Sequence, residues 1–239
     1  MKDHAGRSSS VWMTTAMLPR FAKLGENEQA DVIIVGAGIA GLTTAYLLGQ
    51  AGKSVIVLDD GPIVSGETER TTAHLVTALD DRYFELERLH GEKGAQLAAE
   101  SHSAAIDQIE RIVQHEHINC DFERLNGYLF VPPGEPTDIL DRELAAAQRA
   151  GLRELHMVGR APLTSFDSGR ALCFPRQAQF HPPQIFGGTV PGDHQGWRTH
   201  LYRNARRQDG RGRISPHRNG EWSGCDCRGG GGGDQHPCQ

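Results

Sequence analysis

The hydrophobic pattern between residues 31 and 60 predicts a strand, a helix and a second strand. Residues 31–35 read DVIIV, a continuous β-branched run that ends at a glycine and is typical of a strand buried on both faces of a parallel sheet. A helix is predicted from about Ile39 to Ala51, and residues 54–60, SVIVLDD, predict a second buried strand. Together they predict a right-handed β-α-β unit of about thirty residues with adjacent strands.

Further elements are predicted beyond this unit. Apolar residues at helical spacing between Arg82 and Glu116 predict one or two amphipathic helices. Residues 120–131, CDFERLNGYLFV, predict two short strands that turn at Asn126–Gly127, a dipeptide that favours hairpin turns. Another helix is predicted to end at Gly151, and residues 171–182 return to strand and loop.

The regular pattern breaks down near Pro183. From residue 187 to residue 239 there are thirteen glycines, eight arginines, no lysine and three branched aliphatic residues. Such a segment buries too little apolar surface to offset the ~1–2 kcal/mol per residue lost on ordering the backbone. We therefore expect an N-terminal extension over residues 1–30, a folded part over 31–182 and a disordered tail over 183–239.

The feature that indicates chemistry is the hexapeptide GAGIAG at residues 36–41. Gly36 permits the tight turn out of the strand, Gly38 allows backbone to approach a pyrophosphate, and Gly41 allows the helix to pack against the sheet. The start of the helix supplies amides and a partial positive charge for phosphates. Asp59, at the end of the next strand, is placed to accept hydrogen bonds from ribose hydroxyls and disfavours a 2′-phosphate, so NADP is not expected.

NAD and FAD share this fingerprint, and the downstream sequence favours FAD. A nicotinamide enzyme usually continues directly into another helix and parallel strand, whereas this chain continues into a Thr-rich loop, long helices and a hairpin pattern. Flavoproteins interrupt the nucleotide fold in this way with a substrate-domain insertion. An NAD-dependent dehydrogenase and a non-catalytic nucleotide-binding fragment remain as alternatives.

Residues 30–75, ADVIIVGAGIAGLTTAYLLGQAGKSVIVLDDGPIVSGETERTTAHL, resemble the start of the D-amino-acid oxidase family of FAD-dependent oxidoreductases, named for glycine/D-amino-acid oxidase (deaminating). The resemblance is closest to members that end in a Rieske [2Fe-2S] domain and extends to about residue 182. It implies an α/β protein with a Rossmann-like FAD-binding domain and the start of an α+β substrate-domain insertion. In that family the flavin accepts a hydride from a carbon that bears an amine.

The resemblance also implies the cofactor-binding residues. The residues expected at the FAD pyrophosphate are Gly36, Gly38, Ile39, Ala40 and Gly41. Asp59 is expected at the adenosine ribose, and Arg70, Thr71 and Thr72 match the loop beside the flavin. The expected substrate is a small-molecule amine or amino acid, and its identity and the catalytic residues stay unassigned.

Several histidines are weaker candidates for chemistry. His74 lies close to the flavin loop and His181 lies in the segment FHP, and packing is the favoured role for both. Residues 101–117 carry His102, His115 and His117, but two residues that are two positions apart cannot share one face of a helix. We therefore expect no metal site in the chain.

Three interpretations of the tail remain open. Its Arg/Gly content allows an RNA-binding arm, although repeated RGG units and interleaved aromatics are missing. Its Cys and His residues allow zinc or a remnant Rieske site, although the spacings fit neither. The favoured hypothesis is a frameshift near codon 183. If each codon is read from its second base into the first base of the next codon, the possible codons permit three other amino-acid strings. These are L-K-Y-L after Pro182, R-D-G-G-R-I-Y-T-G-T-H-V across 195–207 and V-V-V-A-T-N-T-P-V across 230–239.

Composition and charge add limits on partners and location. The net charge of -5 does not favour nucleic acid or an acidic membrane as a partner, because binding to either requires an excess of basic residues. No stretch of the sequence approaches the ~18 consecutive apolar residues of a membrane span. Five cysteines, three of them in the last fifteen residues, do not form a disulfide framework and favour a reducing, cytoplasmic setting. We expect FAD-dependent oxidation as the family function, with this 239-residue chain a truncated, inactive fragment.

Overall fold

The structure is a computed structural model. It describes residues 9–21, 24, 28–132, 134, 136–187, 197–201 and 226–227, the last two stretches as backbone alone. The chain divides into two compact units. The first unit comprises Met1–Thr71 and Pro182–Gln239, and the second unit comprises Thr72–His181.

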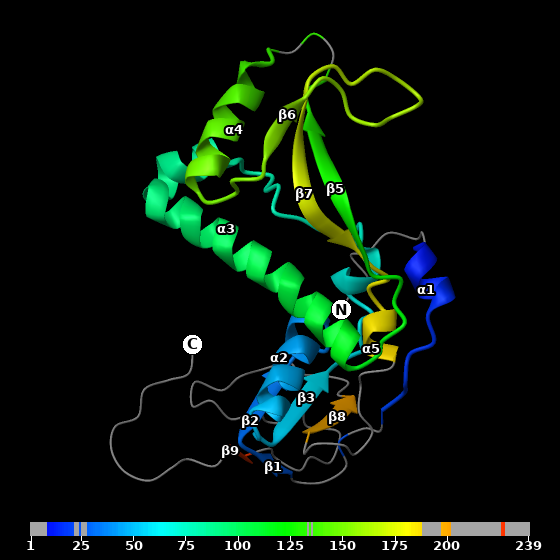
Figure 1. The fold of residues 1–239 in the computed structure, drawn as a ribbon. Coiled ribbons are helices and arrows are strands. Elements are labelled where there is room, and N and C mark those ends of the chain that lie inside the picture. Colours follow the sequence, from blue (N-terminus) through cyan, green and yellow to red (C-terminus); the bar gives the residue numbers. More distant parts are fainter. Residues whose placement is uncertain are drawn as a thin grey trace. The chain divides into compact units, whose positions relative to one another are not determined.

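The first unit contains the predicted β-α-β unit (Figure 1). Strand β2 (Val32–Val35), helix α2 (Ile39–Gln50) and strand β3 (Val55–Asp59) confirm the three predicted elements and their order. Strand β3 pairs in parallel with β2 on one side and with β8 (Trp197–Leu201) on the other. The sheet order is therefore β2-β3-β8, with β3 in the middle.

The burial of the two predicted strands differs. Residues 55–58 of β3 are all buried, whereas the Val35 side chain of β2 is 65% exposed and residues 32–34 are half-buried. The prediction that residues 31–35 are buried on both faces is therefore wrong. Within the part of the chain that the structure describes, β2 pairs with β3 alone.

Short elements lie at both ends of the first unit. In the N-terminal extension, helix α1 (Val11–Thr15) is capped by the Ser10 hydroxyl, and β1 (Gln29–Ala30) pairs with β9 (Asp226–Cys227). Within the stretch expected to be a disordered tail, the described residues form helix α5 (Gln184–Gly187), β8 and β9, and the rest of 183–239 lies outside the described residues. Strand β8 pairs along the side of β3 that is opposite β2.

The second unit is an antiparallel sheet covered by two helices (Figure 1). Its strands are β4 (His74–Leu75), β5 (Glu123–Phe130), β6 (His156–Val158) and β7 (Ala171–Gln179), and its helices are α3 (Tyr83–His115) and α4 (Asp138–Arg149). Strand β7 pairs with β5 on one side and with β4 and β6 on the other. Helix α3 bends at Gly91, whose φ of +71° interrupts the helical backbone, and so agrees with one or two predicted helices.

The hairpin predicted at Asn126–Gly127 is wrong. Strand β5 runs straight through this dipeptide and pairs with β7 on both sides of it. The register shifts between Leu125 and Gly127: Asn126 of β5 faces two residues of β7, Pro175 and Arg176, so the irregularity is a β-bulge in β7 and not a turn in β5. Arg176, one of the two residues in the bulge, has φ +58°, a left-handed conformation. Pairing with a strand about fifty residues away thus overrides the local turn preference.

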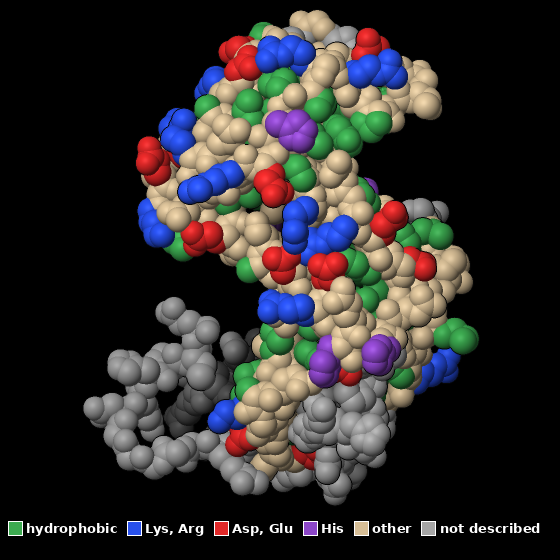
Figure 2. Space-filling view, viewed as in Figure 1, with side chains coloured by type: hydrophobic (Ala, Val, Ile, Leu, Met, Phe, Trp, Pro, Cys, Tyr) green, Lys and Arg blue, Asp and Glu red, His purple; other side chains and the backbone are tan. Residues whose placement is uncertain are grey.

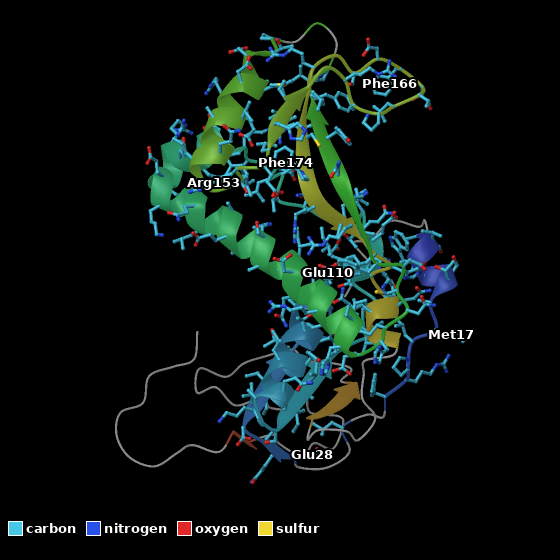
Figure 3. The ribbon with its side chains drawn as sticks, in the orientation of Figure 1. Met17, Glu28, Glu110, Arg153, Phe166 and Phe174 are labelled. Atoms are coloured by element: carbon cyan, nitrogen blue, oxygen red, sulfur yellow. The ribbon has the colours of Figure 1, made fainter. Side chains whose placement is uncertain are left out.

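The core of the second unit lies between β7 and the two helices. Phe174 and Leu172 of β7 pack with Leu140 of α4 and Tyr83 of α3, and all four are buried. Figure 3 shows the labelled Phe174 on the side of β7 that faces these helices. Glu143 of α4 is 1% exposed, and its Oε2 accepts hydrogen bonds from the backbone N–H groups of Tyr83 (2.7 Å) and Phe84 (3.4 Å). A side chain of one helix therefore caps the start of the other.

The surface carries charges of both signs. On the face of the second unit shown in Figure 2, basic and acidic side chains are interspersed and form no broad patch of one sign. Among the described residues, no helix is both long and apolar enough to cross a bilayer.

Candidate nucleotide site

The turn between β2 and α2 has the backbone that its glycines were expected to permit. Gly36 has φ +106°, a conformation that disfavours any side chain, and its N–H donates to the Leu58 carbonyl at 2.7 Å. A Cβ placed on Gly41 would lie 1.9 Å from the Gly36 carbonyl oxygen and 3.3 Å from a methyl group of Ile34. The turn and the helix start therefore sit as close to the strand as a glycine allows.

Asp59 ties the turn to the end of β3. Its Oδ2 accepts a hydrogen bond from the Ala37 N–H at 2.6 Å, and its Oδ1 accepts one from the Gly61 N–H at 2.8 Å. Both carboxylate oxygens therefore contact backbone in this structure, and each retains a further lone pair for another donor. The carboxylate lies where the first and second strands of the unit end, which is the expected place for a ribose.

Thr68 is a residue that the sequence analysis missed. It lies in a 3-10 turn, η1 (Glu67–Arg70), is 8% exposed, and its hydroxyl accepts a hydrogen bond from the Ile39 N–H at 3.0 Å. Its Oγ1 would also be 3.3 Å from a Cβ on Gly38. A hydroxyl thus occupies the start of α2, where amides that lack an intrahelical partner are available to an anion. The available signal was the Gly-, Ser- and Thr-rich composition of residues 61–75, which does not single out Thr68.

The loop between β3 and η1 packs on the fingerprint turn. Ile63 and Val64 are each 1% exposed, and the Val64 N–H donates to the Ala37 carbonyl at 2.8 Å. Val64 also has φ +65°, which is unusual for a β-branched residue and is held here by burial and this hydrogen bond. The turn at Ala37 is therefore fixed from two sides, by Asp59 and by Val64.

Arg70, Thr71 and Thr72, the residues predicted beside the flavin, differ in their contacts and in the unit to which they belong. Arg70 donates from Nη1 to the Ser65 and Gly66 carbonyls at 3.1 and 2.9 Å, so it closes its own loop. Thr71 is exposed and ends the N-terminal part of the first unit, while Thr72 is exposed and begins the second unit. The structure therefore brings the pyrophosphate and ribose candidates together in the first unit, but not Thr72.

The N-terminal segment holds the same loop. The Ser10 hydroxyl donates to the Glu69 carbonyl, and the Trp12 Nε1–H donates to the Thr71 carbonyl at 3.0 Å. These two carbonyls flank Arg70. Residues that were expected to be an irregular extension thus brace the loop assigned to the flavin end.

These residues fit the adenosine diphosphate half of FAD. A Cβ on Gly36 would meet no atom within 4 Å, so open space adjoins the turn where a pyrophosphate is expected, while Gly41 allows the helix start to lie against the turn. The Asp59 carboxylate has acceptor capacity at the strand end. The donor set of backbone amides and a hydroxyl suits phosphate oxygens.

Comparison with known proteins identifies the family. Residues 31–188 match the DAO family, described as FAD dependent oxidoreductase. The chain belongs to this family. FAD is the family's cofactor, which sets aside the NAD-dependent alternative.

This DAO-family chain is similar in sequence to two known proteins and in fold to a third. It is 34% identical over 175 residues to a putative Rieske 2Fe-2S iron-sulfur protein of Bacillus subtilis, covering 73% of this chain and 34% of the relative. It is 25% identical to gamma-glutamylputrescine oxidoreductase of Escherichia coli, covering 58% of this chain and 32% of the relative. L-amino acid deaminase from Proteus vulgaris shares the fold, with a TM-score of 0.56 and 20% identity over 75% of this chain and 41% of that one. The chain thus spans about a third of the length of these curated relatives.

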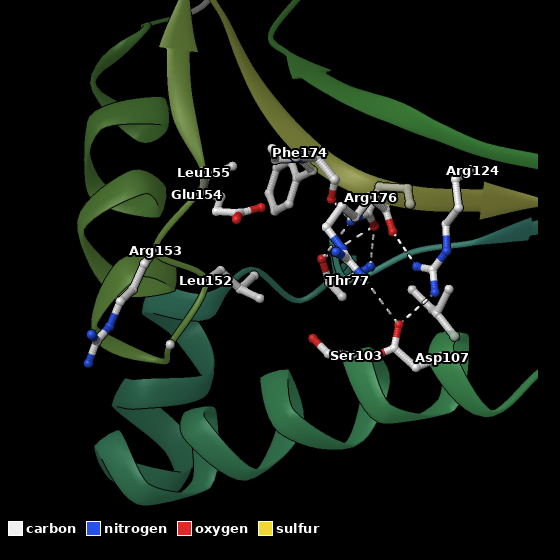
Figure 4. Close-up of a pocket in the computed structure, with 14 residues that line it drawn as sticks. Thr77, Ser103, Asp107, Arg124, Leu152, Arg153, Glu154, Leu155, Phe174 and Arg176 are labelled. Atoms are coloured by element: carbon white, nitrogen blue, oxygen red, sulfur yellow. Dashed lines mark hydrogen bonds and ion pairs between the residues drawn. The ribbon is translucent and has the colours of Figure 1, made fainter. Parts of the chain in front are cut away.

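A cavity of about 420 Å³ lies wholly within the second unit of this DAO-family chain, between α3, β5, β7 and the turn after α4. In Figure 4, Ser103 and Asp107 of α3 lie across it from Phe174 and Arg176 of β7, and Arg153 points away. Two of its charged side chains form an ion pair: Arg124 Nη2 lies 2.6 Å from Asp107 Oδ1. The cavity contains none of the predicted cofactor residues and is not the nucleotide site.

The remaining candidate groups are structural or exposed. His181 is buried, in agreement with the packing role favoured for it, whereas His74 is exposed, so that role is wrong for His74. His102 is also exposed, and its ring contacts the Val76 carbonyl at 3.3 Å. No cluster of three or more metal-ligating side chains occurs among the described residues. Burial raises the pKa of the Cys120 thiol to about 11, so this buried cysteine stays protonated at neutral pH and is a poor nucleophile.

Proposed function

We propose that this chain is the nucleotide-binding front of an FAD-dependent oxidoreductase that oxidises an amine or an amino acid. Gly36, Gly38, Ile39, Ala40 and Gly41 hold the pyrophosphate, and Asp59 holds the adenosine ribose. Arg70, Thr71 and Thr72 form the loop toward the flavin. FAD, when bound, supplies the hydride-accepting chemistry.

The observation that carries this proposal is the arrangement around the fingerprint turn. Asp59 and Val64 both fix Ala37, and Thr68 lies at the first amide of α2. A binding loop held from several sides loses little freedom when a ligand arrives, which favours affinity. The amine or amino-acid class of substrate is supported by the names of the E. coli and Proteus proteins described above.

The first experiment measures binding of ADP and of FAD to the purified chain by isothermal titration calorimetry. We expect ADP to bind, because the residues for this half of the cofactor lie together in the first unit. Thr68→Val keeps the shape of the side chain but removes the hydroxyl, and it should weaken ADP binding about tenfold, equivalent to about 1.4 kcal/mol. No detectable heat with ADP at millimolar concentration would contradict the proposal.

We further propose that the 239-residue polypeptide by itself is inactive and holds FAD weakly or not at all. It covers 34% of the Rieske relative and 41% of the deaminase, so most of the length that those proteins use has no counterpart in it. Amine-dependent dye reduction and flavin absorbance test this directly. Stoichiometric bound flavin in the purified chain would overturn it.

The frameshift hypothesis is kept as part of this proposal. Resequencing the gene across codons 175–239 and beyond tests it: removal of one base should restore L-K-Y-L after Pro182 and open a longer frame. If the reading frame is unchanged, the tail is genuine protein, and its interpretation as an RNA-binding arm or a metal site must be tested. A reducing, cytoplasmic location is also proposed, and it is supported by Cys120 and Cys173, which are buried free thiols.

A further inference from the structure

The cavity of the second unit is bounded on one side by apolar side chains. Ile106 of α3, Leu155 of the segment before β6 and Phe174 of β7 all line it, and all three are buried. Its volume of about 420 Å³ lies within the range of small-molecule sites, which combine apolar walls with a few placed polar groups. The polar groups of this cavity therefore decide which ligand it fits.

The β-bulge in β7 turns the polar end of that strand toward the cavity. Phe174 and Gln177 are three positions apart, so they would face opposite sides of a regular strand. A Cβ on Gly127 would lie 3.8 Å from the Phe174 Cβ and 3.2 Å from the Gln177 Cγ, so both side chains lie on one face. The bulge at Pro175 and Arg176 accounts for this, and residues 174–177 all line the cavity. Bulges beside active sites re-aim side chains in this way.

Arg176, within the bulge, is a loosely paired cation at the cavity. Its Nη2 lies 3.8 Å from Asp107 Oδ1, and its side chain is 69% exposed. The same Asp107 oxygen lies 2.6 Å from Arg124 Nη2, which donates a hydrogen bond to it. Asp107 is therefore engaged mainly by Arg124, and the Arg176 guanidinium retains donors for another anionic group.

Glu154 supplies a carboxylate from a different wall of the cavity. Its side chain is exposed and forms no ion pair or hydrogen bond with the other residues that the structure describes. In Figure 4 it points toward Phe174, whereas the neighbouring Arg153 points away from the cavity. The Ser103 hydroxyl of α3 lies across from Phe174 and also lacks a hydrogen-bond partner among the described residues. The cavity thus offers a carboxylate, a guanidinium and a hydroxyl.

The signs of the two loosely held charges restrict the ligand. An anion would be attracted by Arg176 but repelled by Glu154, and for a cation the reverse holds. A zwitterion places one charge against each of them. An apolar substituent on the same molecule then lies against Phe174 and its apolar neighbours. A free α-amino acid with an apolar side chain has all three groups.

We propose that the cavity between α3, β7 and the turn after α4 binds a free α-amino acid with an apolar side chain. Arg176 and the Ser103 hydroxyl bind its carboxylate, Glu154 binds its ammonium group, and Phe174 contacts its side chain. The inference goes beyond the proposed function, because the cavity contains none of the predicted cofactor residues. It concerns binding within the second unit and involves no redox step.

The test measures binding of L-leucine to the full chain by calorimetry and by NMR of the backbone amides. Isocaproate carries the same chain and carboxylate without the ammonium group, and isoamylamine carries the same chain and ammonium group without the carboxylate. We expect L-leucine to shift the amides of residues 151–155 and 174–177, and both analogues to bind at least about tenfold more weakly. No binding of L-leucine at millimolar concentration, or equal binding of either analogue, overturns the proposal.

Variants of the lining residues assign the binding to the cavity. Arg176→Gln and Glu154→Gln should each weaken L-leucine binding about tenfold, and Arg153→Gln is the matched control that should not. Ser103→Leu places an apolar side chain in the cavity and should abolish binding, whereas Ala104→Leu, at the adjacent exposed position, should leave it unchanged. L-leucine binding that neither Arg176→Gln nor Glu154→Gln weakens overturns the proposal.

A second readout distinguishes a charge contact from a structural role for Glu154. Because Glu154→Gln removes a negative charge, this variant should bind isocaproate more tightly than the parent chain does while it binds L-leucine more weakly. A loss of affinity for both ligands would show that Glu154 shapes the cavity and does not contact the ammonium group, and would overturn its assignment.

ADP titration of the same samples separates this proposal from the proposed function. L-leucine binding without ADP binding leaves the amino-acid site standing and contradicts the nucleotide function. ADP binding without L-leucine binding does the reverse.

Discussion

Asp59 binds the fingerprint turn itself: its Oδ2 accepts the Ala37 N–H at 2.6 Å, across 22 residues of sequence. The residue expected to hold a ribose therefore also holds the turn that is expected to hold the pyrophosphate. Its other oxygen accepts the Gly61 N–H, so one carboxylate joins the turn, the strand end and the following loop.

Asp59→Asn should weaken both the fold and the site. The amide side chain has one acceptor oxygen, so its NH₂ group would face one of the two backbone N–H donors. We expect the free energy of unfolding to fall by about 1–3 kcal/mol and ADP affinity to fall with it. Urea unfolding and calorimetric titration measure the two effects. Asp60→Asn, at the adjacent exposed position, is the control for charge and should change neither; equal effects of both variants would contradict the assignment.

Gly41→Ala should be among the most damaging single substitutions in the first unit. The new Cβ would lie 1.9 Å from the backbone oxygen of Gly36, so helix α2 must move away from β2. Overpacking of this kind destabilises by about 1–3 kcal/mol or more. The expected result is a lower urea midpoint and no measurable ADP binding. Gly159→Ala is the matched control, because a Cβ there meets no atom within 4 Å, and its midpoint should stay unchanged.

Trp12→Phe tests whether the N-terminal segment braces the flavin loop. The substitution keeps an aromatic ring but removes the N–H that donates to the Thr71 carbonyl at 3.0 Å. We expect amides of residues 67–71 to exchange faster, by about fivefold, because a net hydrogen bond is worth about 1 kcal/mol. Hydrogen exchange with mass spectrometry measures this without any cofactor. Met17→Ala, at a side chain that is 95% exposed, should not alter the exchange, and a loop unaffected by Trp12→Phe would show that the contact is incidental.

The features that the sequence predicted correctly are local ones. The strand, turn and helix around Gly36–Gly41 follow from residues that contact one another within a few positions, so their pattern is sufficient. Thr68 was missed because its hydrogen bond to Ile39 spans 29 residues and one Thr among several carries no distinctive signal. The Asn126–Gly127 turn was predicted wrongly because pairing of β5 with β7 decides that backbone. The exposure of Val35 could not be predicted, since burial of a strand depends on which neighbours are present.

Glu143 predicts a specific pH dependence for the second unit. Burial raises the pKa of its carboxyl above the ordinary value of 4.5, although hydrogen bonds from the Tyr83 and Phe84 amides oppose this. Its Oε1 is buried without a hydrogen-bond partner among the described residues, which accounts for the dominance of desolvation. A carboxyl whose pKa is raised by folding stabilises the fold at low pH, and this contribution is lost as the pH rises from about 4.5 through the folded pKa.

Glu143→Gln removes this titration but keeps an acceptor for the Tyr83 amide. As the pH rises, the free energy of unfolding of the parent chain should therefore decrease relative to that of Glu143→Gln. Glu143→Ala should be less stable than the parent chain by about 1–3 kcal/mol at every pH, because it loses the cap. Urea titrations from pH ~4.5 upward, followed by a probe in the second unit, measure the difference. Glu92→Gln on the exposed side of α3 controls for the loss of one negative charge. A difference between the parent chain and Glu143→Gln that stays constant with pH would show that the Tyr83 and Phe84 amides, and not burial, determine the ionisation of this carboxyl.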